Sequence, residues 1–214
     1  MGKETMKHKS ILLKRLTQDN RGRYREVIGL IGTHHGVGVT YTGMLLAFYY
    51  GEELGKKTAL LECNQHRDMR LIQSAYEWRE NETMSFSFHR ITCYHEVKAN
   101  QLSQIYGDDY EVIILDFGAD LTSNMEELLR CTTKIVIGGS SEWDIMKLKD
   151  FISKVEELHG SEHWLYFLPR CSERTVNILR SEVKRKIWAV PEAQEPTRPN
   201  NNVKQFFKQN LIAR

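Results

Sequence analysis

Short apolar runs alternate with amphipathic segments along the chain from residue 26 onward. Each run is continuously apolar, which is typical of strands buried on both faces of a parallel sheet. The segments between the runs carry apolar residues at helical spacing, such as Met44, Leu45 and Phe48. The pattern therefore predicts βα units in a doubly wound, mainly parallel α/β sheet of about six or seven strands, with helices on both faces. The predicted strands cover residues 27–31, 58–61, 112–115, 135–137, 164–168 and 187–190.

One stretch departs from this rhythm. Residues 82–97 contain Phe86, Phe88 and Ile91, which suit either one strand or a short hairpin, and the pattern leaves both open. No shift in composition and no run of Gly, Ser or Pro marks an internal boundary. We therefore expect one domain over residues 25–214, preceded by a basic N-terminal arm at residues 1–24.

The charge lies at the two ends of the chain. Residues 1–25 have a net charge of +6, residues 196–214 of +4 and the remainder of −8, although the whole chain carries only +2. Basic termini permit contact with a membrane surface or with nucleic acid, but charged termini are more often simply solvated.

The cysteines are spread along the chain without a C-x-x-C pair, at Cys63, Cys93, Cys131 and Cys171. This spacing is typical of reduced, buried thiols. The apolar run at residues 11–13 is too short for a signal sequence or a membrane span. We therefore expect a cytoplasmic protein, with any membrane contact peripheral and at the inner membrane face.

A glycine-rich turn joins the first predicted strand to the first predicted helix. Gly32, Gly38 and Thr40 match the spacing of the phosphate-binding pattern G-x-x-x-x-G-K-[ST], while Val39 stands in place of its lysine. In such a loop, backbone N–H groups converge on an anion at the positive end of a helix, and the Thr hydroxyl can ligate Mg²⁺. The alternative interpretation is a tight turn in another α/β fold, where glycine supplies only a positive φ.

This loop resembles that of the MinD/ParA family of deviant Walker-A P-loop ATPases, which usually reads K-G-G-V-G-K-[ST]. Residues 34–40 read H-H-G-V-G-V-T, so the lysines of the family pattern are replaced by His34 and Val39. Residues 57–62 and 110–118 resemble the family's second strand and its Walker-B strand. The resemblance covers roughly residues 26–212, and the chain resembles a degenerate member of this family. The D-x-G ending of the Walker-B strand looks most like the TadZ/CpaE branch, which positions pilus-assembly machinery.

The resemblance implies a site for ATP or ADP with Mg²⁺, and a homodimer formed through the nucleotide face. The metal would be held by Thr40 and Asp116, with Glu62 as a further candidate. The implied nucleotide-binding residues are Gly32, His34, His35, Gly36, Val37, Gly38, Val39, Thr40 and Tyr41.

The missing lysines change the expected chemistry. In this family the loop lysine balances phosphate charge, and the signature lysine reaches across the dimer to stabilise the transition state. Because Val39 and His34 occupy these positions, ATP hydrolysis is expected to be absent or very slow, while nucleotide binding is less affected. His34 and His35 either supply partial positive charge or are solvated loop residues.

The C-terminal segment places apolar residues on one helical face, at Val203, Phe206, Phe207 and Leu211. It resembles the membrane-binding tail of MinD, but the pattern favours the last helix of the fold packing on the sheet.

Three functions follow from these observations. The first is a non-catalytic or very slow nucleotide-binding protein that acts as a positioning or scaffold factor for an assembly such as a pilus or secretion machine. The second is an active ParA-type ATPase in DNA or cargo partitioning, in which another basic residue replaces the lost lysines. The third is an α/β interaction module that binds no nucleotide.

Overall fold

The computed structural model describes residues 25–77 and 84–212 of the chain, so the arm expected at residues 1–24 lies outside the described residues. The described part contains one eight-stranded sheet in the order β3-β4-β2-β5-β1-β6-β7-β8. All neighbours are parallel except β3 and β4. The strands are β1 (Glu26–Gly32), β2 (Thr58–Glu62), β3 (Ser85–Phe88), β4 (Ile91–Tyr94), β5 (Val112–Asp116), β6 (Thr133–Ile137), β7 (Leu165–Pro169) and β8 (Lys186–Val190).

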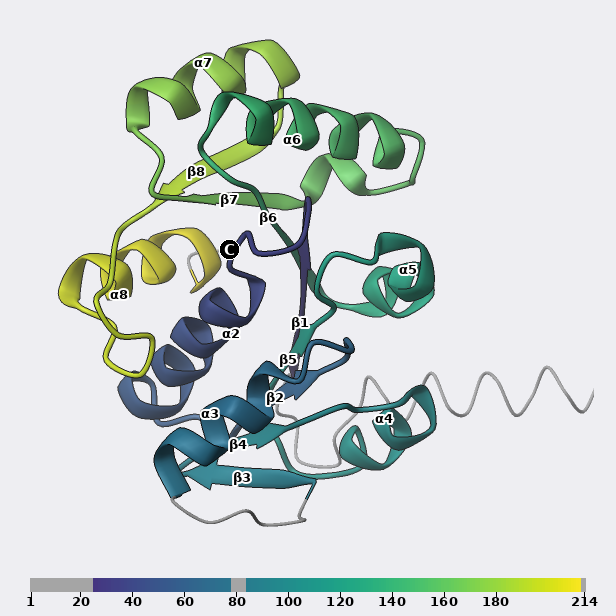
Figure 1. Ribbon diagram of the computed structural model, residues 1–214, viewed down its shortest axis with the longest axis vertical. Coiled ribbons are helices and arrows are strands. Elements are labelled where there is room, and N and C mark those ends of the chain that lie inside the picture. Colours follow the sequence, from purple (N-terminus) through teal and green to yellow (C-terminus); the bar gives the residue numbers. More distant parts are fainter. Residues whose placement is uncertain (1–24, 78–83, 213–214) are drawn as a thin grey trace, which may run out of the picture.

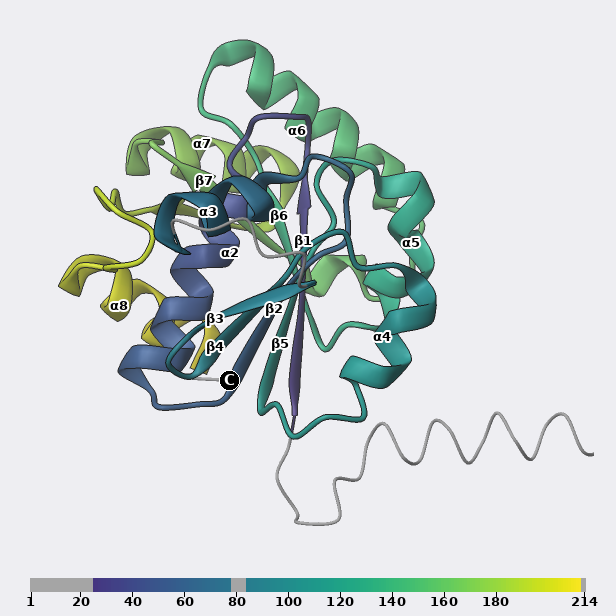
Figure 2. The same ribbon diagram turned by 60° about the horizontal axis from the view of Figure 1, so that its bottom comes forward.

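Helices cover both faces of this sheet, as Figures 1 and 2 show. The fold is thus the doubly wound α/β architecture that the sequence predicts. The helices are α2 (Val39–Phe48), α3 (Asp68–Glu77), α4 (Ala99–Ile105), α5 (Leu121–Arg130), α6 (Glu142–Val155), α7 (Glu173–Val183) and α8 (Asn201–Phe207). A π-helical turn follows α2 at Tyr49–Glu53 and another follows α8 at Lys208–Ile212, and a 3₁₀ turn lies at Ser161–His163.

Strand β1 lies at the centre of the sheet. β1 pairs in parallel with β5 on one side and with β6 on the other. All five residues of β5 are buried, because helices cover the central strands on both faces. The sheet has eight strands rather than six or seven because residues 85–94 form an antiparallel hairpin, which resolves the alternative that the sequence left open.

Two apolar cores lie on opposite faces of the sheet. One contains side chains of α2, α3 and α8, and the other contains side chains of α4, α5, α6 and α7. Helix α2 is enclosed by the sheet and α8, so it is apolar on nearly all sides. Gly43 lets α2 lie close to the sheet, since a Cβ there would lie 3.1 Å from Leu60 Cδ1 of β2.

The C-terminal segment belongs to the first core. Val203, Phe206, Phe207 and Leu211 are all buried there. The ring of Phe206 lies 5.1 Å from that of Phe167 on β7, and the ring of Phe207 lies 5.4 Å from that of Tyr49. The apolar face of α8 is therefore used in packing the domain, as the sequence pattern favoured.

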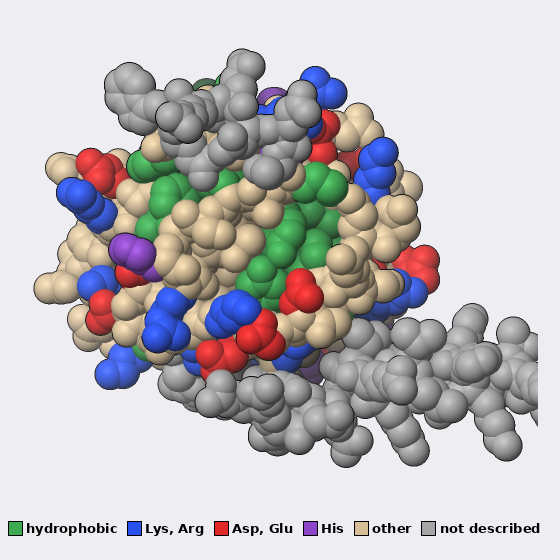
Figure 3. Space-filling model, turned by 90° about the horizontal axis from the view of Figure 1, so that it is seen from below, with side chains coloured by type: hydrophobic (Ala, Val, Ile, Leu, Met, Phe, Trp, Pro, Cys, Tyr) green, Lys and Arg blue, Asp and Glu red, His purple; other side chains and the backbone are tan. Residues whose placement is uncertain are grey.

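Strand β3 forms one edge of the sheet, four strands from β1. Figure 3 views the molecule from this side, and it shows hydrophobic side chains on the surface among charged ones. The exposed apolar residues near this edge are Leu71 and Tyr76 on α3 and Met84 just before β3. The glycine-rich loop lies away from this edge, at the carboxyl end of the central strand.

None of the helices in residues 25–77 and 84–212 is both long enough and apolar enough to cross a membrane.

Candidate functional site

The glycine-rich loop connects β1 to α2 and leaves the first turn of that helix uncapped. Gly36 and Gly38 have φ values of 80° and 99°, in the left-handed region that favours glycine. Gly38 is the N-cap of α2, and no side chain caps this helix. By contrast, α5, α6, α7 and α8 are each capped by a side chain, from Asp120, Ser141, Ser172 and Asn200. The backbone N–H groups at the start of α2 are therefore available to an anion.

Val39 turns its side chain into the protein rather than into the loop. It is the first residue of α2 and only 7% exposed. A Cβ at Gly32 would lie 2.8 Å from Val39 Cγ2 and 2.9 Å from Val37 Cγ1, so Gly32 is needed for this close packing. The valine that replaces the Walker-A lysine thus contributes to the core and supplies no charge.

Polar oxygens converge beside Thr40 at the start of α2. Its hydroxyl donates to Asp116 Oδ2 at 2.7 Å, and Asp68 Oδ2 lies at 3.3 Å from the same hydroxyl. Asp116 Oδ1 accepts from Asn64 Nδ2 at 3.0 Å and from the backbone N–H of Gly118 at 2.9 Å. The predicted pairing of Thr40 with Asp116 is therefore present, and a hydroxyl next to a carboxylate is the hard oxygen donor set that suits Mg²⁺.

Burial raises the pKa of Asp116 above its ordinary value, against the hydrogen bonds from Thr40 and Gly118, which lower it. The carboxylate is fully buried at the end of β5. Its charge is thus less favourable in the folded protein than in the unfolded chain, and a bound cation would offset this penalty.

Asp116→Asn is expected to stabilise the ligand-free protein at pH 7, because it removes a buried charge that the folded protein disfavours. An aspartate whose folded pKa is raised loses folding stability as the pH rises through the unfolded pKa towards the folded one, and asparagine avoids that loss. Denaturant unfolding of both proteins at pH 7 without Mg²⁺ measures the difference. A variant less stable than wild type by 1 kcal/mol or more would make the carboxylate a structural anchor instead.

The contacts and the lowered pKa of His34 prevent it from acting as a free cation in the loop. Its Nε2 lies 3.0 Å from Asp144 Oδ1 on α6, and its Nδ1 lies 2.9 Å from Thr33 Oγ1. Burial lowers the pKa of His34, and Lys147 acts in the same direction while Asp144 opposes both. The histidine that replaces the signature lysine therefore anchors the loop to α6.

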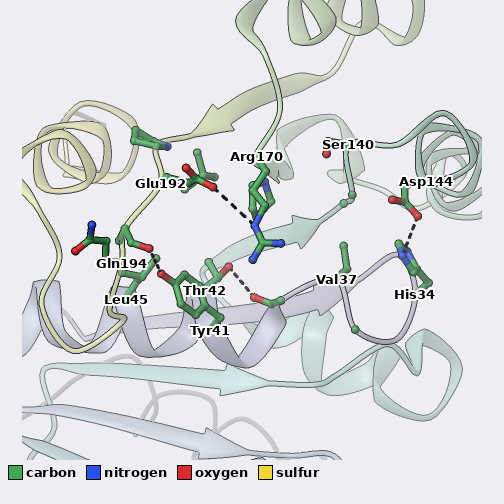
Figure 4. Close-up of a pocket in the computed structure, with 18 residues that line it drawn as sticks. His34, Val37, Tyr41, Thr42, Leu45, Ser140, Asp144, Arg170, Glu192 and Gln194 are labelled. Carbon is green, nitrogen blue, oxygen red and sulfur yellow. Dashed lines mark hydrogen bonds and ion pairs between the residues drawn. The ribbon is translucent and has the colours of Figure 1, made fainter.

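A cavity of about 380 Å³ opens on one side of the loop. Figure 4 shows Arg170, from the β7–α7 loop, directed into it, with Glu192 beside it. The Arg170 Nε lies 4.0 Å from Glu192 Oε1, and both side chains are about 80% exposed, so this pair is weak and adjustable. Tyr41 donates its hydroxyl to the Ala193 carbonyl at 2.6 Å and thereby fixes the β8–α8 loop at the cavity edge.

The remaining predicted residues divide between two cavities. His34, Gly36 and Gly38 line the larger cavity and also a second one of about 260 Å³, which His35 and Thr40 line as well. Glu62 lies apart from both. Its carboxylate is buried and accepts the backbone N–H groups of Met69 and Glu96, each at 3.2 Å.

The structure also assembles polar residues that the sequence did not single out, namely Asn64, His66, Asp68, Asp144 and Arg170. One signal was available for Arg170, because it directly follows a parallel strand, and ligands of α/β sheets bind outside the carboxyl ends of the strands. Within the described residues, no group of three or more His, Cys, Asp or Glu side chains is placed to hold a metal ion, and the four cysteines are free.

No protein-family model matches the chain, and no curated protein is detectably similar to it. Solved structures do match. A ParA family ATPase from Chlorobium tepidum gives a TM-score of 0.62 at 16% identity, over 87% of this chain and 92% of that one. A plasmid partition protein from Borrelia burgdorferi bound to AMPPNP gives 0.65 at 13%, over 88% and 97%. The septum site-determining protein MinD with Mg-ADP from Pyrococcus horikoshii gives 0.56 at 16%, over 88% and 97%.

The chain therefore has the P-loop fold of the MinD and ParA ATPases. At these identities the likeness establishes the fold and leaves the activity to the residues of the site.

Proposed function

We propose that this protein is a degenerate MinD/ParA-like nucleotide-binding protein that hydrolyses ATP very slowly or not at all and acts as a positioning or scaffold factor. The uncapped start of α2, with Gly36 and Gly38 at positive φ, carries the proposal, because it offers backbone N–H donors to a phosphate without any side-chain competitor. The solved structures with AMPPNP and Mg-ADP add support from the same fold.

In this proposal each part of the site has a binding role. The loop N–H groups hold the phosphates, and the larger cavity takes the nucleoside between Arg170 and the loop after β8. Thr40 and Asp116 would hold Mg²⁺, which neutralises phosphate charge when it is bound. With no lysine in the loop, the protein retains donors for binding but little positive charge where the transferred phosphoryl group would need it.

A second candidate is an active ATPase of the partitioning type. Arg170 favours it, because this guanidinium is directed into the cavity beside the loop and its partner Glu192 binds it weakly. Arg170 lines the larger cavity, whereas Thr40 lines the smaller one, so we assign Arg170 to nucleotide binding. ATP turnover separates the two candidates.

We also propose that the protein forms a homodimer through its nucleotide face. In this proposal the dimer is cytoplasmic, and its basic ends make peripheral contact with the inner membrane face or with nucleic acid. Trp143 and Met146 support the dimer, since these side chains on the first turns of α6 are 68% and 64% exposed. They flank Asp144, the partner of His34 in the loop. Large exposed apolar side chains beside a site are typical of a protein contact.

Trp143→Ser is expected to prevent Mg-ATP from driving self-association. Wild type should change from monomer towards dimer when Mg-ATP is added, because the contact forms on the nucleotide face. Sedimentation velocity with and without the nucleotide measures this, with Leu71→Ser on α3 as a control of equal exposure. A dimer that forms equally in the Trp143 variant, or a wild type that stays monomeric, would reject this interface.

A further inference from the structure

The smaller of the two cavities beside the glycine loop contains a pair of histidines from separate segments. His35 belongs to the loop and His66 to the connection between β2 and α3, and their ring centroids lie 4.4 Å apart with the planes tilted by 42°. Both side chains are exposed at the cavity of about 260 Å³. No hydrogen bond to another described residue is formed by a nitrogen of either ring, so the rings can donate to a ligand.

The position of His66 is fixed by the same network that holds Asp116. Its backbone N–H donates to Asn64 Oδ1 at 3.0 Å, while Asn64 Nδ2 donates to Asp116 Oδ1. The ring lies against Gly118, where a Cβ would be 3.2 Å from His66 Nε2. The absence of a side chain at Gly118 therefore leaves room for this imidazole at the cavity wall.

The two cavities meet at the loop. Gly36, Gly38 and Tyr41 line both of them, so a ligand that crosses the start of α2 extends from one cavity into the other. The larger cavity is lined by polar groups together with apolar side chains such as Tyr41, Leu45 and Val190, a mixture that suits a nucleoside. The smaller one holds Thr40 and the histidine pair, which suit the terminal phosphoryl group of a nucleoside triphosphate.

We propose that His35 and His66 bind the terminal phosphoryl group of a nucleoside triphosphate and so make the site selective for triphosphate over diphosphate. This inference rests on the proposed nucleotide-binding function and adds its specificity-determining residues. Imidazole N–H groups donate to phosphate oxygens, and when protonated they also supply positive charge. The pair thereby takes over part of the contact that lysine makes in an intact loop, and it offsets the nearby carboxylate of Asp68, which lines the same cavity.

The experiment compares the affinities for Mg-AMPPNP and Mg-ADP by isothermal titration calorimetry at pH 7. His35→Ala combined with His66→Ala should weaken AMPPNP binding at least about tenfold, because hydrogen bonds to a charged group are lost, and change ADP binding less than about twofold. The double glutamine variant keeps an N–H donor at each position and should recover part of the loss. His89→Ala is the matched control, because His89 lies in the β3–β4 turn and is 87% exposed.

The outcomes distinguish the role of the histidine pair from nucleotide binding itself. Equal weakening of AMPPNP and ADP, or no weakening of either, overturns the role of the histidine pair and leaves the nucleotide site in place. A folded wild type that binds neither nucleotide overturns the proposed function and this inference together. Thermal melting of each variant establishes that it is folded before its affinity is interpreted.

Discussion

Purified wild-type protein is expected to hydrolyse Mg-ATP far more slowly than about one turnover per second, the lower end of the ordinary range for enzymes. The reason is electrostatic. Val39 is packed over Gly32 and His34 is paired with Asp144, so neither supplies the charge that stabilises a transferred phosphoryl group. Groups of that kind change phosphoryl-transfer rates by about 10³ to 10⁵. Release of phosphate under single-turnover and steady-state conditions measures the rate.

Val39→Lys tests the cause directly and should raise the rate or the affinity for ATP. Because Val39 is buried, this change also removes packing, at a cost of about 1 to 3 kcal/mol of stability. Val39→Met controls for the change of shape without adding charge. A wild type that turns over ATP at one per second or faster would contradict the degenerate site, and Arg170→Ala, with Arg174→Ala on α7 as its control, would then test the active alternative.

Millimolar Mg-ATP is expected to raise the melting temperature of wild type and to have no effect on Gly38→Glu. A ligand that binds only the folded state stabilises it by about 2.7 kcal/mol when its concentration is a hundredfold above Kd. Gly38 is the N-cap of α2 at φ 99° and lies beside the N–H groups proposed to bind the phosphates, so a glutamate there opposes phosphate by charge. Thermal unfolding with and without nucleotide measures both shifts.

Gly38→Ala separates backbone strain from charge in this experiment. No heavy atom lies within 4 Å of a Cβ at this position, so the strain of the positive φ is the main effect of alanine. The alanine variant should melt lower than wild type and still respond to Mg-ATP. If wild type itself does not respond, the loop is a structural turn and the protein is an interaction module without nucleotide.

The sequence by itself determined the architecture, because that depends on patterns local to each segment. Continuous apolar runs predicted buried parallel strands, and helical spacing predicted the helices between them. The apolar face of residues 203–211 was sufficient to favour a core helix, and the structure buries it. The glycine loop was located by spacing alone, since the strand, the turn and the helix that form it are consecutive.

Short apolar runs predict secondary structure less reliably. Residues 82–97 fitted one strand or two, because a run of four residues has no reliable period and its pairing partner decides the outcome. In the structure β4 pairs with β2 on one side and β3 on the other, and that pairing makes the hairpin part of the sheet.

Only the tertiary structure decided which side chains meet at the site. His34 finds its partner on α6, His35 meets a ring from the β2–α3 connection, and Arg170 enters from a loop more than a hundred residues along the chain. These contacts arise because parallel strands bring their carboxyl ends to one edge of the sheet, whatever their distance in sequence. The sequence shows that both lysines are missing and that Val39 can supply no charge. Only the structure shows that His34 is paired with Asp144 and so does not replace the signature lysine.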